Sequence, residues 1–178
     1  MKRDHLEHII RAAAVIADVD ELMIVGSQSI LGAYPNAPTA LLVSQEVDLY
    51  PFHHPERADI IEGAIGELSM FHETFGYYAQ AVGPETCILA PNWESRLIAV
   101  KNEGTRGATG WCLAPVDLAV AKLSAQRAKD FHFVQIMLEH QLISIDSLLN
   151  LLDLTPVQEA KKQIALAFLK QLHTPSSN

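Results

Sequence analysis

The sequence predicts an α+β fold, in which a mixed sheet flanked by helices is followed by a C-terminal helical subdomain. Over the first 114 residues, short runs of branched and aromatic residues alternate with segments of helical periodicity. From residue 115 onward the helical spacing continues without a strand-like run. We therefore predict an α/β core over residues 1–114, a helical subdomain over 115–173 and a disordered tail over 174–178.

The first elements follow from local spacing. Apolar residues recur every three or four positions between Asp4 and Ala17, which predicts an amphipathic helix. The apolar run Leu22–Val25 predicts a strand, and Gly26 ends it. Ser27 can cap a second helix that extends to Gly32.

Carboxylates and apolar residues alternate in the next segment. We predict that residues 41–43 and 46–50 are extended, and that Glu46, Asp48 and Tyr50 share one face. Pro55 then opens a helix that runs to Leu68. Further strands are predicted at 76–82, 87–89, 97–100 and 110–113, and further helices at 116–126, 129–140, 145–152 and 156–172.

Composition narrows the classes of function. Thirteen Lys and Arg residues against 21 Asp and Glu residues give a net charge of −8, so the chain has no uniform basic field for a nucleic-acid backbone. Its two cysteines form no CxxC pair, which fits a reducing compartment. With no long apolar run, we expect a cytoplasmic protein that does not use a membrane.

The turn and the acidic strand together suggest a site for a metal and a phosphate. Glu46 and Asp48 can offer hard oxygen ligands to one Mg²⁺ ion. Gly26 permits a close backbone approach, and the turn at Ser27 can direct N–H groups at a phosphate. Each piece has a simpler interpretation, because a Gly-Ser turn is often only a cap and an acidic pair is often only solvated.

A second segment, from Asp117 to Asp130, carries a local basic patch. Lys122, Arg127 and Lys129 lie close to Asp130 in the sequence, around the junction between two predicted helices. The simpler interpretation is a solvated helix surface with ion pairs of little energetic consequence.

Together the two segments resemble the nucleotidyltransferase superfamily, and in particular bacterial proteins related to abortive-infection and toxin–antitoxin toxins. The turn before an acidic pair matches that family, and so does the later run Asp-Leu-x-x-x-Lys-Leu-x-Ala-x-Arg-x-Lys-Asp. The resemblance implies binding of a nucleoside triphosphate with Mg²⁺ or Mn²⁺ and transfer of a nucleotidyl group to a hydroxyl of RNA or protein, with an antitoxin as partner.

The resemblance also implies roles for single residues. Glu46 and Asp48 would act as catalytic metal ligands and Asp130 as a catalytic base or a supporting acid. The nucleotide would be bound by four residues: Gly26, Ser27, Lys122 and Arg127.

Two departures from the family pattern keep other functions open. Glu46 stands where the family has Asp, and Gln80 stands where a third carboxylate often lies. A degenerate nucleotidyltransferase domain that serves as a binding or regulatory module is therefore the alternative. A third hypothesis is a structural protein whose leucine-rich C-terminal helices form a homodimer. His53 and His54 could also ligate zinc, although no further Cys or His at a recognisable spacing completes that site.

Overall fold

The structure is a computed structural model that describes residues 1–173, and it divides the chain into two compact units. The first unit comprises Met1–Cys87 and Glu94–Ala114, and the second comprises Ile88–Trp93 and the chain from Pro115 onward. The fold is α+β, as the sequence predicts. The predicted tail at 174–178 lies outside the described residues.

The first unit is built on a five-stranded mixed sheet with the order β3-β2-β1-β5-β4. Its central strand β1 pairs antiparallel with β2 and parallel with β5, while β2–β3 is a parallel pair and β4–β5 an antiparallel one. The strand bounds are β1 Glu21–Ile24, β2 Glu46–Pro51, β3 Tyr78–Ala81, β4 Ile98–Val100 and β5 Thr109–Cys112.

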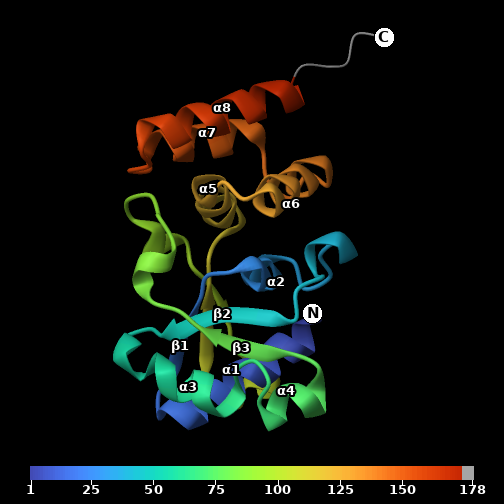
Figure 1. Ribbon diagram of the computed structural model, residues 1–178, viewed down its shortest axis with the longest axis vertical. Coiled ribbons are helices and arrows are strands. Elements are labelled where there is room, and N and C mark those ends of the chain that lie inside the picture. The colour runs from blue at the N-terminus through green and yellow to red at the C-terminus, as the bar shows by residue number, and fades with distance from the viewer. Residues whose placement is uncertain (174–178) are drawn as a thin grey trace. The chain divides into compact units, whose positions relative to one another are not determined.

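Helices α1 (Arg3–Ala17), α3 (Ala58–Ile65) and α4 (Met70–Phe75) lie together on one side of β2 and β3 (Figure 1). The predicted face of α1 is confirmed in full, because Leu6, Ile9, Ile10, Ala13, Ala14 and Ala17 are all buried. Val47 and Leu49 of β2 are completely buried as well. Since side chains alternate along a strand, Glu46 and Asp48 point to the opposite face.

The second unit is helical, with α5 (Pro115–Ala125), α6 (Ala128–Glu139), α7 (Ile145–Leu154) and α8 (Glu159–His173). Helix α5 contacts each of the other three. The core of the second unit includes Leu118, Leu123, Val134, Met137, Leu148, Leu152 and Leu169. Among the leucines of the C-terminal helices, Leu148 and Leu152 are thus part of this core, whereas Leu154 is 65% exposed.

Four local predictions are wrong. The helix predicted to run to Leu68 ends at Ile65, and Leu68 has a positive φ of 62° and is 81% exposed. Residues 87–89 form no strand; this short run lies between prolines, and Ile88 is exposed. The predicted extended run at 41–43 instead begins with the end of a 3₁₀ turn, Thr39–Leu41. The predicted helix from Ser27 to Gly32 is a 3₁₀ turn, η1 (Ser27–Ser29), followed by the short α2 (Ile30–Ala33), and neither has a side-chain N-cap bond.

Helix α4 was not predicted from the sequence. With six residues it is too short to show helical periodicity. Its visible signal is the N-cap Ser69, whose hydroxyl accepts a hydrogen bond from the backbone N–H of His72.

Among residues 1–173, none of the helices combines the length and the apolar character needed to cross a bilayer.

Two helical glycines make a matched test of packing. A Cβ on Gly32 would lie 2.5 Å from the Cβ of buried Cys112, whereas one on Gly63 would meet nothing within 4 Å. We expect Gly32→Ala to destabilise the protein by about 1–3 kcal/mol through overpacking. Gly63→Ala should stabilise it by roughly 0.5–1 kcal/mol through helix propensity. Thermal unfolding followed by circular dichroism measures both, and equal shifts would contradict the packing of α2 against β5.

Candidate nucleotide and metal site

The candidate site begins where β1 and β2 run side by side. Ile24 pairs with Leu49, and the backbone N–H of Val25 donates to the carbonyl oxygen of Asp48 at 3.0 Å. The chain then leaves the sheet at Gly26. The sequence-predicted turn and acidic pair are therefore neighbours in space.

Gly26 and Asp48 are in direct contact. A Cβ built on Gly26 would lie 1.6 Å from Oδ2 of Asp48, so the carboxylate occupies the space that any larger residue would need. The backbone N–H of Ser29 donates to the carbonyl of Gly26 at 2.9 Å and so forms the turn η1. The glycine is thus required by the position of the Asp48 carboxylate.

Glu46 is held by a residue of the neighbouring strand. The hydroxyl of Tyr78 donates to Oε2 of Glu46 at 3.3 Å. Burial, followed by the nearby charges of Glu46, Glu67 and Asp48, raises the pKa of Tyr78 to about 12. The phenol is therefore neutral at neutral pH, and among the paired residues of β2 and β3 the acidic ones are Glu46 and Asp48.

The register of β2 and β3 determines which groups flank the acidic pair. Glu46 is paired with Tyr78, and Asp48 with Gln80. Paired residues of neighbouring strands point to the same face of the sheet. The amide of Gln80 therefore lies beside Asp48 on β3.

The second unit contains a buried ion cluster at the junction of α5 and α6. Asp130 is completely buried; Nζ of Lys122 lies 3.2 Å from its Oδ1, and Nε of Arg127 lies 2.6 Å from its Oδ2. Lys122 also lies over the ring of Phe133, 4.3 Å from its centroid. The side chain of Arg127 is 60% exposed, whereas that of Lys122 is 9% exposed.

The charge state of Asp130 follows from these partners. Burial alone would raise its pKa, but hydrogen bonds and charge from Arg127 and Lys122 outweigh that effect and lower the pKa below its ordinary value. An aspartate with a lowered pKa and both oxygens engaged is a poor base. Within its unit, the geometry supports a role in positioning Lys122 and Arg127.

The structure therefore groups the predicted residues in two sets. Gly26, Ser27, Glu46 and Asp48 are brought together in the first unit. Lys122, Arg127 and Asp130 are brought together in the second. That the two sets serve one site stays a prediction.

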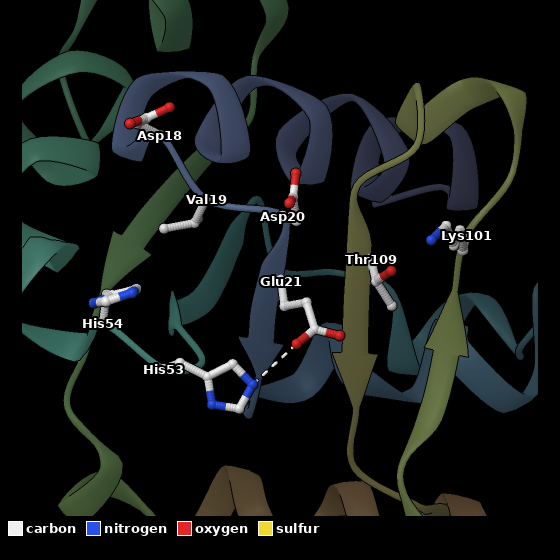
Figure 2. A pocket seen from close by; sticks show the side chains of 8 residues that line it. All are labelled: Asp18, Val19, Asp20, Glu21, His53, His54, Lys101 and Thr109. Carbon is white, nitrogen blue, oxygen red and sulfur yellow. Dashed lines mark hydrogen bonds and ion pairs between the residues drawn. The ribbon is translucent and has the colours of Figure 1, made fainter.

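A separate pocket of about 480 Å³ lies at the start of β1 (Figure 2). Its lining includes Asp18, Glu21, His53 and Lys101. Nε2 of His53 lies 2.9 Å from Oε2 of Glu21, whose Oε1 accepts a hydrogen bond from the indole N–H of Trp111 at 3.0 Å. Five residues of extended chain, about 16 Å, separate Glu21 from Gly26, so this pocket is distinct from the acidic pair.

The zinc hypothesis for His53 and His54 gains no support. In the described part of the chain, residues 1–173, no three His, Cys, Asp or Glu side chains are grouped so that they could hold a metal ion. His53 pairs with Glu21, and His54 lies 3.2 Å from Glu56.

Comparison with protein families identifies the chain. A family model described as "Nucleotidyltransferase of unknown function (DUF6036)" matches residues 4–170. The chain belongs to this family. The match includes both the acidic strand and the Asp117–Asp130 segment, and it confirms the predicted nucleotidyltransferase resemblance. A search of curated proteins and a search of solved structures gave no match.

Sequence reasoning missed one contributor to the candidate site. Tyr78 was assigned to a strand but given no role, although its hydroxyl holds Glu46. The signal was available only in part, since the strand is evident from the sequence whereas its register with β2 is not.

The contact between Gly26 and Asp48 can be tested without any ligand. We expect Gly26→Ala to destabilise the protein by about 1–3 kcal/mol, because its methyl group displaces the Asp48 carboxylate. Asp48→Gly removes the carboxylate that obstructs a methyl group at position 26. In that background, Gly26→Ala should destabilise the protein much less. Urea unfolding of the wild type, the two single variants and the double variant measures this coupling, and strictly additive effects would contradict the contact.

The buried ion cluster predicts a dependence of stability on pH. Because the pKa of Asp130 is lowered in the folded state, its stabilising contribution is present above about pH 4 and is lost as the pH falls through the folded-state pKa. We expect Asp130→Asn to lower the free energy of unfolding by about 3–5 kcal/mol at pH 7, since two cations lose their buried partner. The variant should also lack the part of the acid destabilisation that comes from protonation of Asp130.

Asp153→Asn is the matched control, because Asp153 pairs with Lys162 at 2.6 Å but is exposed. It should change stability little. Thermal midpoints between about pH 7 and about pH 3 give the comparison. Equal losses in the two variants at pH 7 would show that Asp130 is no more important than a surface carboxylate.

Proposed function

We propose that this protein binds a nucleoside triphosphate with Mg²⁺ or Mn²⁺ and transfers a nucleotidyl group to an acceptor hydroxyl. The observation that carries the proposal is the Asp48 carboxylate lying against the Cα of Gly26. The carboxylate could hold a metal. The adjoining turn has no side chain at Gly26 and could therefore admit a phosphate.

The donor set fits a hard divalent cation. Glu46 and Asp48 offer carboxylate oxygens from one face of β2, and both side chains are only partly exposed. Mg²⁺ and Mn²⁺ prefer oxygen ligands and are commonly held by one or two carboxylates together with substrate phosphates. When bound, the cation would neutralise phosphate charge during the transfer.

The transfer itself is a substitution at the α-phosphorus. The acceptor oxygen forms a bond to that phosphorus, the bond to the bridging oxygen of the β-phosphate breaks, and pyrophosphate leaves. The hydroxyl proton is released to water. We assign Gly26 and Ser27 to the phosphates, and Lys122 and Arg127 to the negative charge that develops on them. Asp130 is proposed to position these two cations, because its carboxylate binds both.

We extend the proposal to the acceptor and the setting that the family resemblance implies. RNA or protein would supply the hydroxyl, and the protein would act as a toxin with an antitoxin as its partner. The acidic net charge favours a local contact with RNA over broad coating of a nucleic acid.

One observation favours a second function. Gln80 beside Asp48 cannot accept a proton as a carboxylate can, which suits a nucleotide-binding or regulatory module without turnover. Both functions predict binding of triphosphate together with metal. They differ in the release of pyrophosphate, which only the enzyme would produce.

Binding of triphosphate should depend on a divalent cation. Two carboxylates repel a triphosphate unless a cation is bound between them. We expect calorimetric titration with the four ribonucleoside triphosphates to show binding in Mg²⁺ or Mn²⁺ and little in EDTA. Asp48→Asn keeps the shape of the side chain but removes a charge, and it should weaken binding at least about tenfold, or ~1.4 kcal/mol.

Asp59→Asn provides the matched control, because Asp59 is an exposed acid in the first turn of α3. It should bind triphosphate like the wild type. Binding that is equal with and without metal, or unaffected by Asp48→Asn, would show that the acidic pair is only a solvated strand face.

A further inference from the structure

We infer that Gln80 limits the proposed site to a single divalent cation, which binds together with the nucleotide. This inference rests on the proposed function and names the metal content of that same site. It starts from the register of the two strands, which places Gln80 beside Asp48 and Tyr78 beside Glu46.

The paired residues of β2 and β3 offer charge for one cation. Glu46 and Asp48 carry two negative charges, whereas their partners on β3 are a phenol and an amide. Two carboxylates neutralise one divalent cation. Two such ions held about 3.5–4 Å apart, as in two-metal sites, repel each other strongly and require further anionic ligands between them.

The neighbouring strands do not supply a third carboxylate. β3 is the edge strand of the sheet, so no strand lies beyond Gln80. On the other side, the segment next to Asp48 is Val25–Gly26. Within residues 1–173, no three acidic, His or Cys side chains are grouped closely enough to bind a metal.

The hydrogen bond of Glu46 also favours a single cation. One of its oxygens already accepts a hydrogen bond from the hydroxyl of Tyr78, which reduces its capacity to bridge two ions. The protein alone therefore offers a weak metal site, and the phosphates of the nucleotide must supply the remaining oxygen ligands.

The test measures how much Mn²⁺ the protein retains, with and without a triphosphate. Equilibrium dialysis at pH 7 with Mn²⁺ and each of the four ribonucleoside triphosphates should give one Mn²⁺ per bound nucleotide. Mn²⁺ alone should bind weakly. Gln80→Glu adds a carboxylate beside Asp48, and we expect it to strengthen binding of Mn²⁺ alone at least about tenfold.

Gln45→Glu is the control for added charge. Gln45 is exposed and precedes Glu46 on the chain, so its side chain starts from the other face of the strand. It should leave Mn²⁺ binding close to the wild-type value. Circular dichroism of both variants establishes that each is folded.

The outcomes separate this inference from the proposed function. Two Mn²⁺ ions per nucleotide in the wild type, or Mn²⁺ binding that Gln80→Glu fails to strengthen, would overturn the inference while leaving nucleotide binding intact. If the wild type retained none of the triphosphates in Mn²⁺, the proposed function itself would fail.

Discussion

The packing of the Asp48 carboxylate against the Cα of Gly26 is the contact on which the geometry of the candidate site depends. It exists because β1 and β2 are antiparallel and because the N–H of Val25 binds the carbonyl of Asp48. A slip of one residue in this register would turn Glu46 and Asp48 toward the core and bring Val47 and Leu49 out of it. Burial of the apolar side chains therefore fixes the position of the carboxylates, although the carboxylates themselves contribute nothing apolar.

The carboxylates of the two units lie in different surroundings. In the second unit, the buried Asp130 is balanced within the unit by Lys122 and Arg127. In the first unit, Glu46 and Asp48 stay partly exposed, and the partner of Glu46 on β3 is a neutral hydroxyl. A compensated buried charge is typical of a structural network, whereas carboxylates grouped on an accessible face invite a cation. This contrast is why the acidic pair is the better candidate for metal chemistry and Asp130 the better candidate for positioning.

Much of the fold was predictable, because local periodicity reports local structure. All six apolar residues predicted to form the buried face of α1 are buried, and the acidic strand and the helices after Pro115 were found close to their observed bounds. What depends on distant partners was not predictable. The pairing of Asp48 with Gln80 joins segments 32 residues apart, and the hydrogen bond from Tyr78 to Glu46 depends on that pairing. The helix α4 was missed for the opposite reason, since six residues carry too little periodicity to be recognised.

Glu46 is one methylene longer than the aspartate expected at this position, and Tyr78 explains how the longer side chain can be accommodated. A glutamate has one more rotatable bond than an aspartate, and ordering it costs more side-chain entropy. The hydroxyl of Tyr78 binds Oε2 and restricts that extra rotation. The same bond occupies part of the carboxylate, so the glutamate is held at the expense of some capacity to bind metal. A shorter carboxylate at position 46 would withdraw from Tyr78 and regain that capacity. Tyr78 and Gln80 therefore act in one direction, since the hydroxyl of Tyr78 engages an oxygen of Glu46 and the amide of Gln80 adds no charge beside Asp48.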